Sequence, residues 1–148
     1  MTEPVALIVG AGPGISGAFG EALVADGYRV ALAARHRDRL EPLAAAMGAT
    51  AFEADAASPA SVERLFEDVE ARLGAPEVVL YNPSARVRGE LLSLDMAAAA
   101  AALQVTAIGA LATAQQAARR MVPRGRGSTF FTGATADAMC TQLASMRP

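Results

Sequence analysis

The most informative absence in this 148-residue sequence is lysine, because all 13 basic residues are arginines. The single cysteine, Cys140, excludes an internal disulfide framework and a cysteine-based zinc site, and the single histidine, His36, excludes a multi-histidine metal site. The formal net charge of −2 lacks the basic surplus that is typical of nucleic-acid-binding domains. With 53% hydrophobic and 19% charged residues, the composition excludes an intrinsically disordered chain. We therefore expect one folded domain with no metal site and no nucleic-acid partner.

Signals for export or membrane insertion are weak. Residues 1–4 carry no positive charge and the apolar run after them stops at Gly10, so we expect no signal peptide. Residues 96–118 are long enough to cross a bilayer, but most of them are alanine, and Gln104, Gln115 and Gln116 interrupt the run. We interpret this stretch as a helix packed against protein, and we expect a cytoplasmic chain without a membrane partner.

Strand-like and helix-like stretches alternate along most of the chain. Short apolar runs predict strands at residues 5–9, 29–34, 50–54, 77–81 and 128–132. Helical patterns lie between them, at residues 18–25, 38–47, 58–73 and 94–122. Strands separated by helices of about a dozen residues imply right-handed crossovers. The sequence therefore predicts an α/β fold with a doubly wound parallel sheet.

Residues 9–17, with the sequence V-G-A-G-P-G-I-S-G, form the most informative segment. Glycines between a first strand and its helix let the backbone approach a pyrophosphate, and the helix N-terminus adds partial positive charge. A glycine-rich turn without a ligand is the alternative, but the position of the turn favours dinucleotide binding. The residues that we expect to contact the cofactor here are Gly10, Gly12, Gly14, Ile15 and Ser16.

This segment resembles the glycine motif of the short-chain dehydrogenase/reductase family. Gly10-x-x-x-Gly14-Ile15 fits that family's T-G-x-x-x-G-x-G motif, with Val9 in place of the threonine and Ser16, whose hydroxyl can still donate to a phosphate, in place of the last glycine. The resemblance covers residues 5 to about 136. It implies a Rossmann-type sheet of about five strands in the order 3-2-1-4-5, incomplete on its C-terminal side. Residues 1–136 would then form an NAD(P)-binding domain and residues 137–148 an atypical tail.

Polar residues after the second, third and fourth strands complete the expected cofactor site. Arg35 follows the second strand, where an acidic residue would bind the ribose of NAD and an arginine accommodates the 2′-phosphate of NADP. We therefore expect NADP(H) to be favoured over NAD(H); the alternative is that Arg35 and Arg37 are solvated residues at a helix start. Asp55 matches the family's aspartate near the adenine, with the backbone of Ala56 beside it, although Asp55 also fits a simple helix entry. Asn82 is the one match to the family's N-N-A-G turn.

Most residues of the family's catalytic machinery have no counterpart in this sequence. Thr106 stands where the family has an asparagine that helps to hold a proton-relay water, and Ala134, followed by Thr135, stands at the catalytic serine. The family's Y-x-x-x-K motif, in which the lysine lowers the pKa of a proton-donating tyrosine, is absent. The two tyrosines, Tyr28 and Tyr81, both come earlier, and only Tyr81 lies near the cofactor end of the expected sheet. The catalytic residues are therefore unknown, and the ending resembles a truncated or frame-shifted one.

The resemblance implies a parent activity of NADP(H)-dependent alcohol oxidation or carbonyl reduction. We interpret the chain as the cofactor-binding portion of such an oxidoreductase, inactive or nearly so by itself. The alternatives are a non-catalytic nucleotide-binding or scaffolding module and a truncated fragment without function. The corresponding long helix of the family packs across a dimer interface, so the resemblance implies a homo-oligomer through the helix at 94–122. Phe130 and Phe131 would also leave an apolar sheet edge exposed, so we expect a dimer, a larger assembly or aggregation and no clean monomer.

Overall fold

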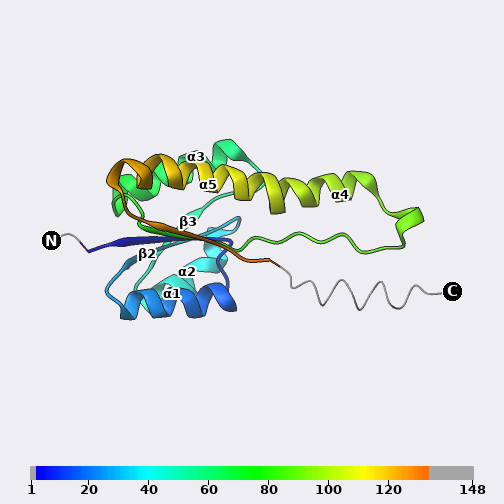
Figure 1. Ribbon diagram of the computed structural model, residues 1–148. Helices are drawn as coiled ribbons and strands as arrows, with labels where there is room; N and C mark the ends of the chain where they lie inside the picture. The colour runs from blue at the N-terminus through cyan, green and yellow to red at the C-terminus, as the bar shows by residue number, and fades with distance from the viewer. Residues whose placement is uncertain (1–2, 134–148) are drawn as a thin grey trace.

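The computed structural model describes residues 3–133. In these residues a parallel sheet of five strands lies between two layers of helices (Figure 1). The strand order is β3-β2-β1-β4-β5, which confirms the predicted doubly wound topology. Ala134, Thr135 and the expected tail at 137–148 lie outside the described residues.

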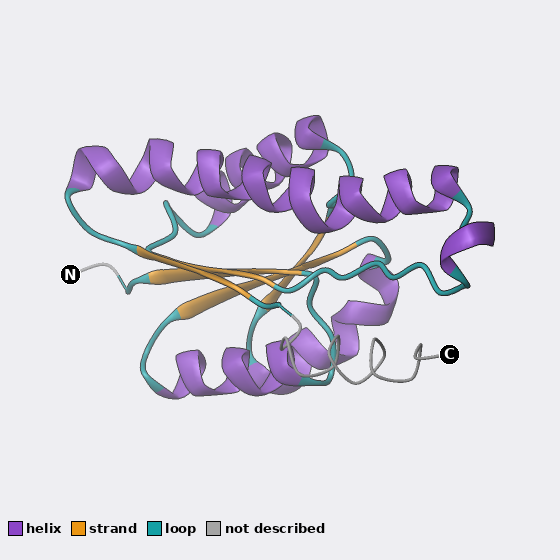
Figure 2. Cartoon of the chain, turned by 45° about the vertical axis from the view of Figure 1, so that its right-hand side comes forward, coloured by secondary structure: helices purple, strands orange, loops and turns teal. Residues whose placement is uncertain are grey.

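The strands follow the predicted positions closely. They are β1 (Val5–Val9), β2 (Arg29–Ala34), β3 (Thr50–Glu53), β4 (Val78–Tyr81) and β5 (Ser128–Phe131). The α-helices are α1 (Ile15–Ala25), α2 (Arg37–Met47), α3 (Pro59–Arg72), α4 (Met96–Leu103) and α5 (Gly109–Met121). Short 3-10 turns cover Leu91–Ser93 and Val122–Arg124, and a π-helical segment covers Gln104–Ile108. Figure 2 shows the helices on both faces of the sheet.

Local signals explain where several helices begin and end. Ser58 caps α3, because its hydroxyl oxygen accepts a hydrogen bond from the backbone N–H of Ser61 at 3.2 Å, and Pro59 occupies the first helical position. Gly48 ends α2 in the left-handed conformation with φ of 73°. Helix α1 begins at Ile15, earlier than the predicted residue 18, because glycines weaken the helical pattern in the sequence.

The central strand β1 is buried at every position and separates two hydrophobic clusters. Leu7 faces the layer of α3 and α5, where Phe66 is fully buried, whereas Ile8 faces the layer of α1 and α2. In the layer of α3 and α5, Arg120 links the two helices. Its Nε donates to Glu70 at 2.9 Å, and its guanidinium lies 5.2 Å from the centre of the Phe66 ring. Both faces of the central strand β1 are therefore covered.

The predicted single helix at 94–122 differs from the observed one. Asp95 caps α4 by accepting from the N–H of Ala97 at 2.8 Å, so the helix begins at Met96, and the π-helical segment interrupts it. Only α5 packs on the domain. Helix α4 extends beyond the sheet, with Met96 74% and Leu103 61% exposed, so within one chain this half does not make the expected packing against protein (Figure 1). By length and composition Met96–Arg124 would suffice to span a membrane, a test that core helices of soluble proteins also pass.

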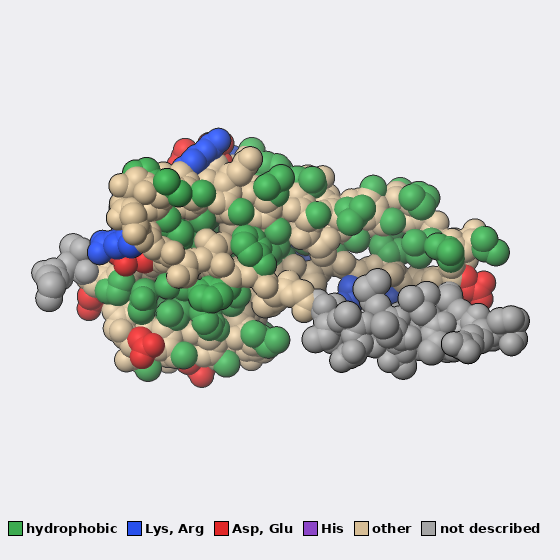
Figure 3. Space-filling view, in the orientation of Figure 1, with side chains coloured by type: hydrophobic (Ala, Val, Ile, Leu, Met, Phe, Trp, Pro, Cys, Tyr) green, Lys and Arg blue, Asp and Glu red, His purple; other side chains and the backbone are tan. Residues whose placement is uncertain are grey.

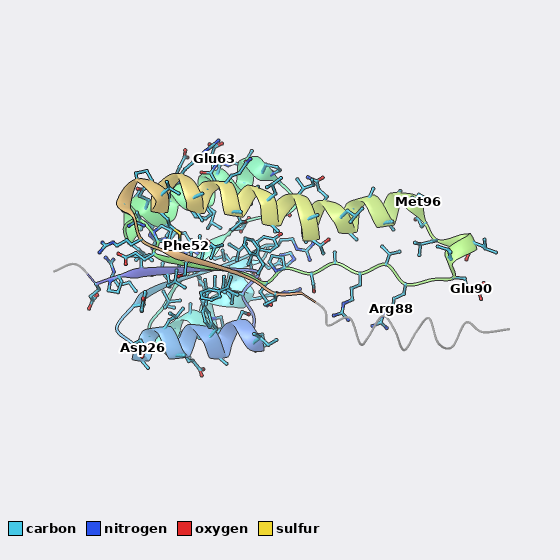
Figure 4. The ribbon with its side chains drawn as sticks, viewed as in Figure 1. Asp26, Phe52, Glu63, Arg88, Glu90 and Met96 are labelled. Carbon is cyan, nitrogen blue, oxygen red and sulfur yellow. The ribbon has the colours of Figure 1, made fainter. Side chains whose placement is uncertain are left out.

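The chain before α4 is extended and runs beneath that helix. We call this extended segment and α4 together, residues 84–103, the arm. Both ribbon views show this segment leaving the C-terminal end of β4, turning at Leu91–Ser93 and returning as α4 (Figures 1 and 2). Figure 4 shows Arg88, Glu90 and Met96 on the arm, well away from Phe52 at the sheet. The arm begins directly beside the expected cofactor site.

Candidate cofactor site

A cavity of about 770 Å³ lies at the carboxyl ends of the strands, where the chain switches from one side of β1 to the other. This is the place where doubly wound sheets bind their ligands. Five segments contribute its lining: the glycine turn at 9–13, the end of β2 with α2 (34–36, 39, 40, 42 and 43), the turn after β3 at 54–56, the residues after β4 at 82–85, and Val105.

The glycine turn requires glycine at position 10 for two reasons. Gly10 has a φ of +76°, and a side chain there would lie 2.5 Å from the backbone nitrogen of Pro83. The N–H groups of Gly10 and Ala11 both donate to the carbonyl of Ala33, at 2.9 and 3.0 Å. The turn is therefore fixed to the end of β2 and pressed against the residues after β4.

Ser16 closes this turn from inside, which corrects the expectation that its hydroxyl donates to a phosphate. Ser16 is 2% exposed; its hydroxyl accepts from the N–H of Gly12 at 3.0 Å and donates to the Gly12 carbonyl at 3.2 Å. Gly17 packs on the same carbonyl, which would lie 2.9 Å from an added Cβ. The first turn of α1 is therefore drawn tightly against the glycine loop.

These bonds decide which backbone donors are left for an anion. The N–H groups of residues 10–12 have acceptors within the protein, and Pro13 has no N–H. Ala18 donates to the carbonyl of Gly14 at 3.1 Å, so the N–H groups of residues 14–17 precede the helical ladder. Gly14 makes no side-chain cap, and the first turn has no acidic residue. An anion at this end of the cavity would therefore bind at the N-terminus of α1.

Arg35 stands exposed at the end of β2 and lines the cavity together with His36 and Arg39. Among the residues that the structure describes, neither Arg35 nor Arg39 forms an ion pair, whereas Arg37 pairs with Glu41 at 3.0 Å. His36 is exposed as well. Beyond Arg35 lies a smaller cavity of about 540 Å³, whose charged lining residues are Arg35, Glu53, Asp55, Arg64 and Asp68. Arg35, Ala54 and Asp55 line both cavities.

The turn after β3 holds Asp55 in a defined orientation. One carboxylate oxygen of Asp55 accepts from the N–H of Ala57 at 2.9 Å, and the N–H of Asp55 donates to the hydroxyl of Ser61 at 3.0 Å. Asp55 is exposed and Ala56 is buried, and both line the cavity. This turn therefore presents a fixed carboxylate and a small apolar surface to the cavity.

Asn82 links the ends of three neighbouring strands. Its Nδ2 donates to the carbonyl of Gly10 at 3.4 Å, and its Oδ1 accepts from the hydroxyl of Thr132 at 2.8 Å. The N–H of Asn82 also donates to the carbonyl of Val9 at 2.9 Å. Asn82 lines the cavity, and its side chain maintains the shape of that edge.

The hydroxyls of Tyr81 and Thr106 both donate hydrogen bonds to backbone carbonyls. Tyr81 is 2% exposed and donates to the backbone carbonyl of Val105, and it does not line the cavity. Burial, with a smaller effect of the nearby Asp55 carboxylate, raises the pKa of Tyr81 to about 12. The hydroxyl of Thr106 donates to the carbonyl of Ala102 at 2.8 Å within its own helix. The sequence did not single out Val105, whose only signal was its place directly before Thr106.

The structure thus gathers most of the expected cofactor residues around one cavity. Those that line it are Gly10, Gly12, Arg35, Asp55, Ala56 and Asn82. Gly14, Ile15 and Ser16 do not line it; the first two lie at the N-terminus of α1 beside it, and Ser16 is buried. A doubly wound sheet with a glycine-rich turn and an uncapped helix at its switch point defines a dinucleotide-binding domain.

Comparison with known proteins places this domain in a family. The sequence model of the short chain dehydrogenase family matches residues 4–145, and the chain belongs to that family. Members of this family bind NAD or NADP. The match continues beyond residue 136, where the resemblance from individual motifs ended.

Three individual proteins illustrate the relationship. A sorbitol dehydrogenase of Cereibacter sphaeroides is 29% identical over 132 residues, which cover 88% of this chain and 52% of that protein. The human 3-oxoacyl-[acyl-carrier-protein] reductase is 26% identical over 133 residues, covering 88% of this chain and 56% of the reductase. A short-chain type dehydrogenase/reductase from Mycobacterium marinum superposes with a TM-score of 0.82 at 28% identity, over 93% of this chain and 58% of that one. The chain spans about half the length of the curated relatives that it matches.

Proposed function

We propose that this chain binds NADP(H) in preference to NAD(H) in the cavity at the switch point. The observation that carries the proposal is the Arg35 guanidinium, which is exposed at the end of β2 and lines the cavity. An arginine in this place accommodates the 2′-phosphate of NADP, whereas NAD-binding proteins use a carboxylate. Arg39 lines the same wall and adds to the cationic character of that end.

The remaining residues fit the other parts of a dinucleotide. The uncapped first turn of α1 offers backbone N–H groups to the pyrophosphate, and the space beside Gly12 is open, since an added Cβ would meet no atom within 4 Å. Asp55 and Ala56 fit the adenine, and Asn82 lies toward the nicotinamide ribose. When bound, the nicotinamide ring gives or accepts a hydride; the residues named here bind and orient it.

The experiment that tests the preference is the substitution Arg35→Ala. A charge-assisted bidentate contact with the 2′-phosphate contributes about 1.5–3 kcal/mol, so NADPH should bind about tenfold or more tightly than NADH. Arg35→Ala should remove most of that difference and leave NADH affinity nearly unchanged in calorimetric titrations. The matched control is Arg37→Ala, because Arg37 pairs with Glu41 and does not line the cavity. Equal affinities of the unmodified chain for NADPH and NADH would refute the proposal.

For the whole protein we propose NADP(H)-dependent oxidation of an alcohol or reduction of a carbonyl compound. Support comes from the relatives, which include a sorbitol dehydrogenase and a 3-oxoacyl-[acyl-carrier-protein] reductase. The 148 residues by themselves are proposed to bind the cofactor without useful turnover, because carbonyl reduction needs a proton donor beside the nicotinamide. Tyr81 and Thr106 both direct their hydroxyls to backbone carbonyls, and the sequence contains no lysine.

A non-catalytic nucleotide-binding module is the second candidate, favoured by the same engaged hydroxyls of Tyr81 and Thr106. The two candidates differ in the turnover of the whole protein, whereas for these 148 residues both predict cofactor binding without turnover. With a panel of aldehydes and ketones, NADPH consumption near the order of 1 s⁻¹, ordinary for enzymes, would contradict the non-catalytic alternative. Cofactor binding without turnover is the result that we expect of this chain.

We also propose a cytoplasmic homo-oligomer that assembles through the helix beginning at Met96. Figure 3 shows hydrophobic side chains along the upper layer and out onto the arm. Leu111 is 58% exposed on α5, and Phe130 and Phe131 of the edge strand β5 are each 48% exposed. Exposed apolar surface of this kind is typical of interaction sites and of sheet edges that pair with further strands.

A further inference from the structure

The hydrogen-bond pattern of the long helix changes where it passes the cofactor cavity. In a regular α-helix the N–H of Gly109 would donate to the carbonyl of Val105, four residues earlier. It donates instead to the carbonyl of Gln104, five residues earlier, at the end of the π-helical segment Gln104–Ile108. The Val105 carbonyl is therefore left without its regular helical donor.

Tyr81 supplies a donor to this carbonyl. Its hydroxyl, buried at the end of β4, donates to the oxygen of Val105. Burial raises the pKa of Tyr81 to about 12, so the hydroxyl keeps its proton, and remains a donor, throughout the physiological range. Gly109 makes the approach possible, because an added Cβ there would overlap both the Tyr81 hydroxyl and the carbonyl oxygen of Ala56.

The same segment lines the cofactor cavity at Val105 and bonds to the neighbouring turn through Gln104. Val105 is the one residue of the helix from Met96 to Arg124 that lines the cavity in the described part of the chain. Beside it, Nε2 of Gln104 donates to the carbonyl of Ala57 at 3.0 Å, in the turn that carries Asp55. The register of the helix thus decides which side chain forms this part of the cavity wall.

We propose that Tyr81 is a positioning residue for the dinucleotide, whose hydroxyl holds the Val105 carbonyl out of the α-helical register and so keeps Val105 in the cavity wall. The inference rests on the proposed NADP(H) binding. Without the hydroxyl, the Val105 carbonyl accepts from the N–H of Gly109 and the segment becomes α-helical. Removing one residue from the register rotates the helix before it by about 100°, since an α-helix has 3.6 residues per turn. Val105 then leaves the wall, and Gln104 leaves Ala57.

The substitution Tyr81→Phe tests the inference, with Tyr28→Phe as the matched control. Tyr28 packs in the cluster on the other face of the sheet and does not line the cavity. Titrations at a temperature well below the unfolding transitions of all variants should show about tenfold weaker binding of both NADPH and NADH to Tyr81→Phe, as expected for one buried hydrogen bond. The NADPH-to-NADH ratio should not change, because Arg35 is untouched, and Tyr28→Phe should bind like the unmodified chain.

Two further measurements distinguish positioning from a general effect on stability. In a crystal structure of Tyr81→Phe, the Gly109 N–H should donate to Val105, whereas an unchanged π-helical segment overturns the inference. The second variant, Val105→Ala, keeps the backbone bond and should also weaken NADPH binding, by about threefold, through lost contact in the wall. Affinities of Tyr81→Phe within twofold of the unmodified chain, with only a lower melting temperature, mean a structural role and overturn the inference. If the unmodified chain binds neither dinucleotide, the proposed function fails first and this inference with it.

Discussion

Replacing Ser16 with alanine removes both hydrogen bonds that close the glycine turn. The Ser16 hydroxyl accepts from the N–H of Gly12 and donates to the Gly12 carbonyl, and the serine is 2% exposed. Ser16→Ala keeps the backbone preference of α1 but leaves both backbone groups of Gly12 without this partner. The Gly12 groups are partly buried, so water replaces the hydroxyl incompletely.

The expected loss follows from the two bonds and the burial. A hydrogen bond contributes about 0.5–1.5 kcal/mol, and leaving a buried partner unsatisfied costs about 1–3 kcal/mol, so we expect Ser16→Ala to lower the free energy of unfolding by about 2 kcal/mol. For a domain of this length that loss corresponds to a decrease of about 4–8 °C in the melting temperature. Urea unfolding followed by circular dichroism measures the free energy directly.

Ser93→Ala is the control for this measurement. Ser93 is exposed, and its hydroxyl donates to the carbonyl of Glu90 at 3.5 Å, so its loss should change the free energy of unfolding by less than about 0.5 kcal/mol. If Ser16→Ala unfolds within about 0.5 kcal/mol of the unmodified chain, the hydroxyl does not hold the turn, and the argument from its two bonds is wrong.

Three further predictions concern other parts of the molecule. Arg120→Ala should lower the free energy of unfolding by about 1–3 kcal/mol, because it removes the contacts of the guanidinium with Glu70, Gln116 and the Phe66 ring. The control Arg119→Ala removes only an exposed ion pair at 3.8 Å and should lower the free energy of unfolding by less than about 1 kcal/mol. The pKa of Tyr81 is raised from 10.0 to about 12, so folding favours the neutral form of its hydroxyl. The resulting contribution to the free energy of unfolding is complete below pH 10 and is lost as the pH rises toward 12. Absorbance at 295 nm should therefore show Tyr81 ionising near pH 12 in the folded chain, and ionisation near pH 10 without unfolding would contradict its burial. Sedimentation at micromolar concentration should show an oligomer, and a compact 15.1 kDa species alone would contradict the exposed helix as an interface.

Local pattern in the sequence was sufficient for the topology. Alternation of short apolar runs with helical stretches gave the five strands, and the observed order of the strands confirms the predicted sheet. Ser58 with Pro59 marked the start of α3, and Gly48 marked the end of α2, because capping depends on residues within one turn of the boundary. The glycine turn and Arg35 were placed at the cofactor end for the same reason, since each directly follows a strand.

Only the tertiary structure determined what the individual site residues do. Ser16 reads as a phosphate ligand in the sequence, yet its hydroxyl is enclosed once α1 packs against the loop. Asn82 bonds to Gly10 across 72 positions and Tyr81 to Val105 across 24, and no periodic pattern reports such pairs. The π-helical segment likewise arises because a hydroxyl on β4 reaches a helix carbonyl. Propensity and spacing describe neighbours along the chain, whereas hydrogen-bond partners and burial depend on which distant groups the packed sheet brings together.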